Sequence, residues 1–339
     1  MLLHGIGDTG QAKLASSKAL LVGCGALGTS IADGLVRAGV GTVIIVDRDF
    51  VELTNLQRQV LFDEADVANG TPKAEAACIK LARVNSEVTT EPIVADYNPG
   101  NAIKLAEGCD VIVDGTDNFE TRFLINDVAV KLSIPYVYGG AVGTTGMIYT
   151  MPADGSGPCL RCLFGQAPAA GTGATCDTAG VLGPAASIVA GYQVTEALKI
   201  LTGNADAVNR RMVSIDLWEN TFRQINVDGA RDQDCVCCAK REFEYLDGKF
   251  GSSSTVLCGR NAVQVSPEAG ATTSINFDQV GKQLEVQGEV KVSEYVLRAT
   301  LTDQGDHINL TLFRDGRAII QGTDDISRAK SVYSKYVGL

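Results

Sequence analysis

The sequence lacks any run of about 18 apolar residues, the length that a helix needs to cross a membrane. Its first residues, Met1 to Asp8, contain neither the basic stretch nor the long apolar stretch of a secretory signal. Positive charge is also scarce, since 29 Lys and Arg residues stand against 40 Asp and Glu residues, giving a net charge of -11. An acidic chain disfavours non-specific binding to nucleic acid. We therefore expect neither a membrane nor a nucleic acid among its partners.

What the chain does contain is enough apolar material for a large core. Hydrophobic residues make up 45% of its 339 residues, which excludes disorder along the whole chain. At roughly 100–200 residues per domain, this length predicts one large domain and a smaller one. Ten cysteines in a chain without a secretory signal indicate thiols, a metal site or catalysis in a reducing compartment. We accordingly expect a cytoplasmic protein.

Short apolar runs alternate with helical patterns through the first part of the chain. Buried strands are predicted over residues 18–22, 42–46, 88–95, 111–113 and 136–138. Helices are predicted over residues 27–38, 72–84, 101–107, 119–132 and 185–201. This alternation predicts an α/β fold with a Rossmann-like, doubly wound parallel sheet.

The pattern changes after Gly139. We expect extended structure over 141–151, a loop over 158–184, and an antiparallel pair formed by 212–215 and 222–227. A polar break at 248–255 predicts a linker. The expected domains are thus residues 1–250 and a small α+β domain over residues 256–339. In the second domain we expect strands over 273–277, 296–301 and 308–313, then a helix from about residue 325.

A glycine-rich turn, Gly23-Cys24-Gly25-Ala26-Leu27-Gly28, lies between the first predicted strand and helix. Glycines permit the tight turn and let the backbone approach a phosphate, while the helix N-terminus supplies free N–H groups. Asp47 ends the next strand, where an acidic side chain can meet a ribose hydroxyl. The pattern predicts nucleotide binding by Gly23, Gly25, Ala26, Gly28 and Asp47. It does not separate NAD from ATP, and a glycine turn kept for helix packing is the alternative.

A polar cluster further along the chain favours ATP. It consists of Asn55-Leu56-Gln57-Arg58-Gln59, Pro72-Lys73 and Thr116-Asp117-Asn118. Ligands collect at the carboxyl ends of strands, so Arg58, Lys73 and Asp117 should converge beside the glycine turn. Two cations and a carboxylate suit a triphosphate with Mg²⁺ better than they suit a nicotinamide. A solvated surface charge is the alternative for Arg58 or Lys73 taken alone.

Two C-x-x-C pairs, Cys159 with Cys162 and Cys235 with Cys238, predict a structural Zn²⁺ site with four thiolate ligands. The pairs lie far apart in sequence, so the metal would clamp two distant segments of the antiparallel extension. A redox dithiol and unligated core cysteines are the alternatives. Cys237 is an ambiguous neighbour that could replace Cys238 as a ligand.

These motifs occur in one order together with Pro158 and with the stretch Cys176-Asp177-Thr178-Ala179-Gly180-Val181-Leu182-Gly183. Over about residues 5–245 the chain resembles the E1-like adenylyltransferases of the ThiF/MoeB/HesA group. The resemblance implies that ATP adenylylates the C-terminal glycine of a ubiquitin-like sulfur carrier protein ending in Gly-Gly. It also implies a homodimer, a sulfurtransferase or cysteine desulfurase as a further partner, and a role in thiamine, molybdopterin or related biosynthesis.

The same resemblance assigns residue roles. The glycine turn and Asp47 would hold the nucleotide, with Asp47 on the ribose. The phosphates would be surrounded by Asn55, Gln57, Arg58 and Lys73. Asp117, with Asn118 beside it, would bind Mg²⁺ in the pocket. The zinc ligands would be Cys159, Cys162, Cys235 and Cys238.

Cys176 lies among small residues, and the equivalent cysteine of some relatives takes part in sulfur transfer or in a covalent link to the carrier. A catalytic role and a spectator role are equally weighted for it. The chain departs from the family in lacking an Arg-Tyr-x-Arg-Gln stretch before the first helix, whose arginine reaches the ATP phosphates. Residues 256–339 resemble an extension of some firmicute-type members, which could bind the carrier, support a dimer or be passive.

Two other functions are compatible with parts of the pattern. A catalytically weakened E1-like scaffold would bind ATP and a partner without completing the reaction. An NAD-dependent oxidoreductase would explain the glycine turn and Asp47. It would not explain Arg58, Lys73, Asp117 and the cysteine pairs together, so we favour the adenylyltransferase.

Overall fold

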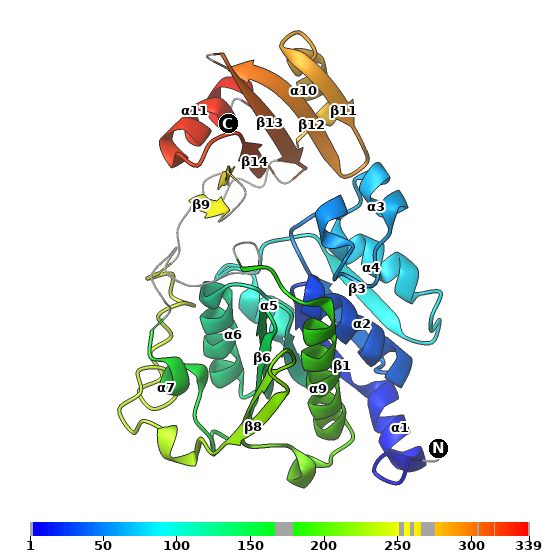
Figure 1. Ribbon diagram of the computed structural model, residues 1–339, viewed down its shortest axis with the longest axis vertical. Helices are drawn as coiled ribbons and strands as arrows, with labels where there is room; N and C mark the ends of the chain where they lie inside the picture. The colour runs from blue at the N-terminus through cyan, green and yellow to red at the C-terminus, as the bar shows by residue number, and fades with distance from the viewer. Residues whose placement is uncertain are drawn as a thin grey trace. The chain divides into compact units, whose positions relative to one another are not determined.

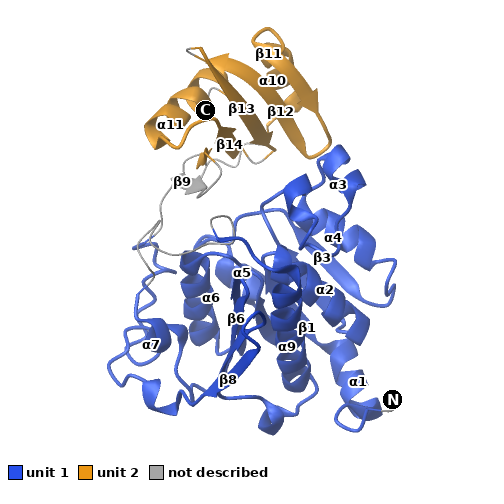
Figure 2. Cartoon of the chain, viewed as in Figure 1, with its two compact units in different colours: residues 1–250 blue, residues 251–339 orange. Residues whose placement is uncertain are grey.

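The computed structural model describes residues 3–166, 179–250, 254–257, 261–265, 275–303, 305–314 and 316–337. The chain forms two compact units, residues 1–250 (unit 1) and 251–339 (unit 2), which Figure 2 shows in different colours. Among the helices described, none has the length and apolar character to cross a membrane.

An eight-stranded sheet lies at the centre of unit 1, with the strand order β3-β2-β1-β4-β5-β6-β7-β8 (Figure 1). Its strands are β1 (Lys18–Val22), β2 (Thr42–Val46), β3 (Thr89–Ile93), β4 (Val111–Asp114), β5 (Tyr136–Val142), β6 (Thr145–Met151), β7 (Met212–Asp216) and β8 (Thr221–Ile225). The neighbours from β3 to β5 pair in parallel, and those from β5 to β8 pair antiparallel. This confirms the predicted Rossmann-like sheet with an antiparallel extension.

Helices cover both faces of this sheet (Figure 1). They are α1 (Gly7–Ser16), α2 (Ala26–Ala38), α3 (Glu64–Asn69), α4 (Lys73–Leu81), α5 (Ala102–Ala106), α6 (Phe119–Leu132), α7 (Leu160–Phe164) and α9 (Gly183–Leu201). Short 3₁₀ helices cover Leu53–Asn55, Ala205–Ala207 and Asp228–Ala230. The segment 158–184, expected as loop, thus contains the helix α7.

The alternation of side chains along β1 explains the two helical layers. Ala19 and Leu21 pack in the core cluster that includes α2, α4 and α9, whereas Leu20 and Val22 pack in the cluster that includes α5 and α6. Successive residues of a strand point to opposite faces, so a strand that is apolar throughout must be covered on both sides. The helices therefore leave the carboxyl ends of the strands as the place for a ligand.

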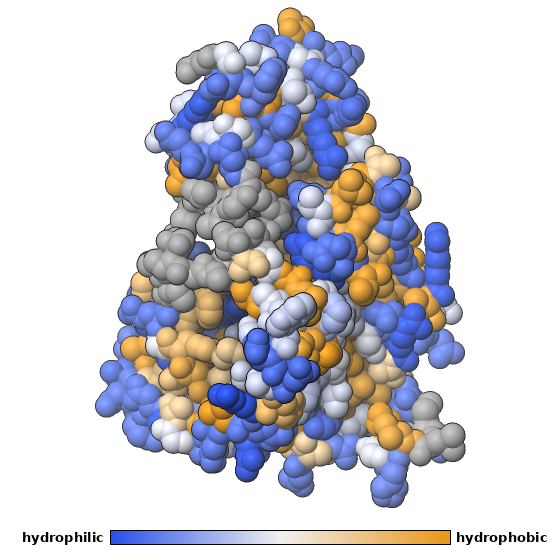
Figure 3. Space-filling model, in the orientation of Figure 1, coloured by the Kyte–Doolittle hydropathy of each residue, from blue (hydrophilic) through white to orange (hydrophobic). Residues whose placement is uncertain are grey.

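Unit 2 is built on a six-stranded antiparallel sheet with the order β11-β12-β13-β14-β10-β9. Its elements are β9 (Ser254–Leu257), β10 (Ala262–Val265), α10 (Phe277–Leu284), β11 (Gly288–Val292), β12 (Val296–Asp303), β13 (Asp306–Phe313), β14 (Ala318–Gln321) and α11 (Ile326–Tyr336). Hydrophilic residues predominate on the face of unit 2 seen in Figure 3, because its apolar residues pack in a core between sheet and helices.

One predicted strand of unit 2, over residues 273–277, is wrong at its described residues, because 275 and 276 belong to no strand. Residues 273–277 were expected to be extended, but Phe277 is the first residue of α10. The Asn276 side chain accepts hydrogen bonds from the N–H groups of Asp278 and Gln279, which caps the helix there. Residues 273 and 274 lie outside the described part of the chain.

Candidate functional site

The predicted phosphate turn joins β1 to α2. Gly23 has a φ angle of +89°, which glycine adopts without strain. A Cβ on Gly28 would overlap the Gly23 carbonyl, as would a Cβ on Gly115 in the loop after β4. Gly25 precedes Ala26 at the start of α2, and no side chain caps the helix there. The turn therefore offers backbone N–H donors at a helix N-terminus, as anion binding requires.

Asp47 connects this turn to the end of β2. Its Oδ2 accepts a hydrogen bond from the backbone N–H of Cys24 at 2.6 Å, and its Oδ1 accepts one from the N–H of Asp49 at 2.7 Å. Burial raises the pKa of Asp47, and the positive charge of Lys73 opposes the rise. Lys73 is only 4% exposed at the start of α4, with its Nζ 3.3 Å from Oδ2 of Asp49. The structure thus brings Asp47, Lys73 and the glycine turn together.

Residues 55–59 form the turn that follows β2. Asn55 and Gln59 are buried, with 2% and 4% exposed, and their side-chain oxygens have no hydrogen-bond partner among the described residues. A Cβ built on Gly25 would lie 3.8 Å from Nε2 of Gln59, so this amide neighbours the phosphate turn. Gln57 is exposed, and Arg58 is half-buried, donating to a carbonyl of its own turn. Gln59 is a candidate that the sequence analysis missed, although its spacing from Asn55 places both on one face of a helical turn.

Asp117 and Asn118 lie on the exposed loop between β4 and α6. Asn118 Oδ1 accepts the N–H of Thr121 at 2.8 Å, so this side chain caps α6. The carboxylate of Asp117 makes no hydrogen bond or ion pair within the described ranges. Burial would lower the pKa of Arg48, but nearby carboxylates, Asp96 first and Asp117 among them, raise it. Asp117 therefore lies close enough to Arg48, which follows β2, to interact with its charge.

A buried ion pair beneath this loop was not predicted. Asp114, the last residue of β4, is fully buried, and its Oδ2 lies 3.3 Å from Nε of Arg122 in α6. Its Oδ1 accepts hydrogen bonds from the backbone N–H and the hydroxyl of Thr116, at 2.8 Å and 2.7 Å. The available signal was an aspartate ending an otherwise apolar strand, with an arginine in the next helix.

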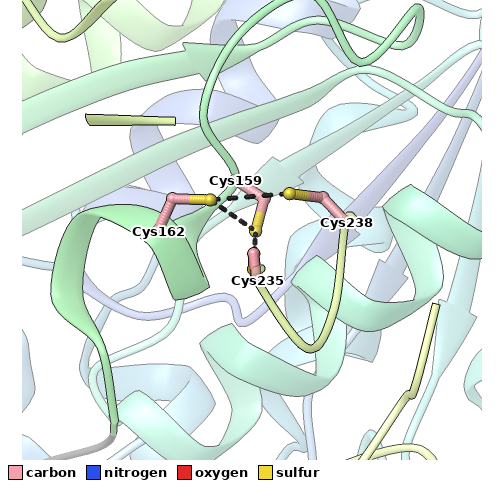
Figure 4. Close-up of side chains that lie close together, drawn as sticks. All are labelled: Cys159, Cys162, Cys235 and Cys238. Carbon is pink, nitrogen blue, oxygen red and sulfur yellow. Dashed lines mark hydrogen bonds between the residues drawn. The ribbon is translucent and has the colours of Figure 1, made fainter. Parts of the chain in front are cut away.

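The four cysteines predicted as zinc ligands lie together: Cys159 precedes α7, Cys162 lies in it, and the other two are in the segment after β8 (Figure 4). Their Sγ–Sγ distances are 3.7 Å for Cys159 and Cys235, 3.5 Å for Cys162 and Cys238, and 3.8 Å for Cys159 and Cys162. Four sulfurs at about 2.3 Å from a tetrahedral zinc ion would lie about 3.8 Å apart. The four donors therefore fit such an ion. Burial raises the pKa of Cys238 to about 12, so metal binding must displace thiol protons.

Cys237 contacts both the cysteine cluster, through Cys159, and the helix α6. Asn126 of α6 donates from Nδ2 to Sγ of Cys237 at 3.2 Å, and its Oδ1 accepts the N–H of Leu160, the first residue of α7. Asp127, also in α6, accepts the N–H of Tyr245 at 2.9 Å. Both cysteine segments are thereby attached to α6, the helix that starts just after the exposed loop. The cluster that could hold a metal contains Cys238.

Cys176 cannot be placed relative to these groups, because residues 167–178 lie outside the described part of the chain. Beyond these residues, Val181 forms an isolated parallel bridge with Gly143 before α9 begins.

Comparison with known proteins places these features in a family. The model of the ThiF family matches residues 1–237. The sulfur carrier protein ThiS adenylyltransferase of Bacillus subtilis is 44% identical over 335 residues, which cover 98% of this chain and 96% of that protein. The SAMP-activating enzyme E1 of Haloferax volcanii is 40% identical over 247 residues, which cover 73% of this chain and 89% of that protein.

Solved structures share the architecture. A crystal structure of E. coli MccB with succinimide matches with a TM-score of 0.58 and 25% identity, covering 68% of each chain. A structure of E. coli MccB with ATP matches with a TM-score of 0.57 at 23% identity, a level that shows the fold alone. The eight-stranded sheet and its covering helices are therefore a known arrangement.

Proposed function

The chain belongs to the ThiF family and is an adenylyltransferase, and from this premise we propose that it transfers AMP from ATP to the C-terminal glycine of a ThiS-like sulfur carrier protein. The observation that carries the proposal is the buried Lys73 beside Asp47 and the glycine turn. A buried cation at this place suits a triphosphate, which carries more negative charge than the pyrophosphate of a nicotinamide dinucleotide. The match to the ThiS adenylyltransferase, 44% identical and covering 98% of the chain, favours a ThiS-like carrier over a MoaD-like one.

The proposed step joins two anions. A carboxylate oxygen of the terminal glycine attacks the α-phosphorus of ATP, forming a C–O–P linkage, while the bond from that phosphorus to the α,β-bridging oxygen breaks. Pyrophosphate leaves with the electron pair, and no proton transfer is needed. Lys73 and Arg58 would offset the repulsion between carboxylate and phosphates, as preorganised cations do. The phosphates would also contact Asn55 and Gln57.

Asp117 is the residue proposed to hold Mg²⁺, with Asn118 beside it. An exposed carboxylate in the loop after a parallel strand has the chemistry of a magnesium ligand. When bound, the ion would neutralise charge on the triphosphate oxygens. The hydrogen bond from Thr121 to Asn118 makes this amide a cap for α6. Asn118 would therefore assist by fixing the loop.

The cysteine cluster is proposed to hold a structural Zn²⁺. Four thiolates complete a tetrahedron and leave no open position for a substrate, so the ion would stabilise rather than react. It would join α7 to the segment after β8, both of which pack on α6. All the described cysteines are free thiols rather than disulfides, which accords with a reducing compartment. We therefore propose that the protein is located in the cytoplasm.

We also propose a homodimer. β8 is an edge strand of the sheet, and three large apolar side chains on or beside it are exposed: Trp218 by 72%, Phe222 by 56% and Ile225 by 47%. Exposed apolar groups beside unpaired strand edges favour association. Light scattering should give twice the chain mass, and Phe222→Asp should halve it. If the wild-type protein had the mass of a single chain at micromolar concentration, the dimer would be contradicted.

ATP–pyrophosphate exchange tests the central proposal. Exchange should require a ThiS-like carrier ending in Gly-Gly, and a carrier without its last glycine should give none. If the protein bound ATP but gave no exchange with either a ThiS-like or a MoaD-like carrier, the alternative of a catalytically weakened E1-like scaffold would be favoured. If Cys176 handles sulfur, Cys176→Ala should lose sulfur transfer from a sulfurtransferase or cysteine desulfurase and keep exchange.

We propose residues 1–250 as the adenylation domain. Every residue assigned above lies within it. Residues 256–339, the small α+β domain, carry none of these groups. The two could be separated by cleavage or truncation at the polar break. A chain ending at residue 250 that retained carrier-dependent exchange would support this division, and loss of exchange in a folded truncation would contradict it.

A further inference from the structure

The loop that carries Asp117 is held on both sides, although the Asp117 carboxylate itself is exposed. On the preceding side, all three polar groups of Thr116 are bonded: its N–H and hydroxyl to Asp114, and its carbonyl to Nη2 of Arg122 at 2.8 Å. On the following side, Asn118 caps α6. The one residue of this loop proposed to meet the metal is thus the one left free of hydrogen bonds within the described ranges.

Arg122 is fixed from several directions. Its guanidinium carbon lies 5.3 Å from the ring centroids of Phe119 and Tyr138, and its Nη2 also donates to the carbonyl of Gly139 at 3.1 Å. Because the guanidinium is planar and makes directed hydrogen bonds, these contacts define its orientation as well as its position. Any substitution of Arg122 would therefore alter the hydrogen bond that it donates to the carbonyl of Thr116.

Asp114 is also held by hydrogen bonds from neighbouring elements. The hydroxyl of Tyr136 in β5 donates to Asp114 Oδ2 at 2.9 Å. Gln193 of α9 donates from Nε2 to the backbone carbonyl of Asp114 at 2.8 Å and to that of Val137 at 3.2 Å. The ion pair is consequently anchored to α6, α9 and two strands at once.

Stability alone is a weak reason for this arrangement. Removing two charges from water costs several kcal/mol per ion, and well-packed apolar residues often replace a buried pair without loss. What an apolar pair cannot supply is the set of directed bonds to Thr116. Precision of this kind matters at a reacting centre, where a shift of about 1 Å can cost 10²-fold in rate.

We propose that Asp114 and Arg122 are positioning residues, which hold the Gly115–Thr116 backbone so that Asp117 presents its carboxylate to metal-bound ATP. The proposal rests on the proposed function, because it specifies how one residue of that site is aimed. It differs from a merely structural role in what it predicts. A structural pair would change the melting temperature, whereas a positioning pair changes kcat and the Mg²⁺ concentration for half-maximal rate.

Small deletions test this with the least risk to folding. Thr116→Val removes the hydroxyl bonded to Asp114, and Tyr136→Phe removes the hydroxyl bonded to the other carboxylate oxygen. Each should lower kcat for exchange about 10-fold and raise the half-saturating Mg²⁺ concentration, with the KM for the carrier unchanged. Thr116→Ser keeps the hydroxyl and should restore both values to within about twofold.

Tyr149→Phe is a matched control. Tyr149 is also buried, and its hydroxyl donates at 2.9 Å to the carbonyl of Pro158, away from this ion pair. Loss of stability alone would act alike in both Tyr→Phe variants. If Tyr149→Phe altered kcat and the Mg²⁺ dependence as much as Tyr136→Phe, the positioning role would be overturned.

A second readout does not depend on activity. Amide hydrogen exchange of the full chain without ATP, followed by mass spectrometry, should show faster exchange in the peptide containing Thr116 and Asp117 for Thr116→Val than for wild type or Thr116→Ser. Equal exchange in all three chains would overturn the proposal. Failure of the wild type to catalyse pyrophosphate exchange would instead refute the proposed function, and the amide measurement would still decide the positioning of the loop.

Discussion

Asp47 accepts the backbone N–H of Cys24 through Oδ2 at 2.6 Å, so the residue that follows β2 is bonded to the second residue of the phosphate turn. Its other oxygen accepts the N–H of Asp49, whose carboxylate in turn pairs with Lys73. The proposed ribose ligand, the phosphate turn and the buried cation are therefore coupled by direct contacts. A change at Asp47 should disturb all three.

Asp47→Asn should weaken ATP binding. The amide can place an oxygen toward only one of the two backbone N–H groups, so its NH₂ must face a second donor. We expect the KM for ATP to rise about 10-fold or more, because hydrogen bonds to charged groups are worth roughly 1.5–3 kcal/mol. Asp33→Asn is the control, since Asp33 pairs with Arg37 on the exposed side of α2. An unchanged KM in Asp47→Asn would argue against Asp47 as a nucleotide ligand.

Lys73→Ala should lower the rate of pyrophosphate exchange by roughly 10²–10³-fold, as expected on removing a preorganised charge from a site of phosphoryl chemistry. Lys80 offers a control in the same helix, because it pairs with Asp63 and Asp66 on the surface rather than at the turn. Lys80→Ala should keep the rate within about twofold. Similar losses in the two variants would mean that α4, and not the Lys73 charge, supports activity.

The strands β1, β2 and β4 of the parallel sheet were predictable because each is a short, largely apolar run, whereas β3 has the more polar sequence Thr-Thr-Glu-Pro-Ile. The range 42–46 matches β2, and 119–132 matches α6, where the capping asparagine at 118 marks the start. Two helices had weaker signals. The apolar pattern of α1 is faint, with only Gly10 and Leu14 buried. The short α3 has no buried residue and begins at a capping box formed by Asp63 and Asp66.

The site was predictable where single motifs carry the chemistry, and not where distant groups combine. The glycine turn and cysteine pairs are fixed by spacing, and the structure brings each set together. Asp114 and Arg122 have no motif of their own, because their pairing depends on how α6 packs beside β4. The side-chain oxygen of Gln59, which has no hydrogen-bond partner among the described residues, likewise can be recognised as a candidate only when the burial of this residue is known.

Zinc content tests the metal site and the identity of its fourth ligand. Cys235→Ser should lose about one Zn²⁺ per chain and lower the melting temperature by on the order of 10 °C, since the ion joins two segments packed on α6. Cys237→Ser should retain zinc, because Cys237 is not among the four cysteines whose sulfurs all lie within 4.8 Å of one another, and its Sγ accepts a hydrogen bond from Asn126. Metal content would be measured by atomic emission. Full zinc content in Cys235→Ser, or its loss in Cys237→Ser, would reassign the ligands.

The acid titration of Asp63 gives a pH-dependent test of the α3 cap. A hydrogen bond from Lys80 Nζ, at 2.5 Å, lowers the pKa of Asp63, and the backbone N–H groups that it caps act in the same direction. Because the folded pKa lies below the unfolded value of about 3.9, the stabilisation is present above that pH and is lost as pH falls through the folded pKa. NMR titration should show an upward shift of the Asp63 pKa in Lys80→Ala, and little shift in Lys80→Arg. Equal values in wild type and Lys80→Ala would show that the cap alone sets the pKa of this carboxyl.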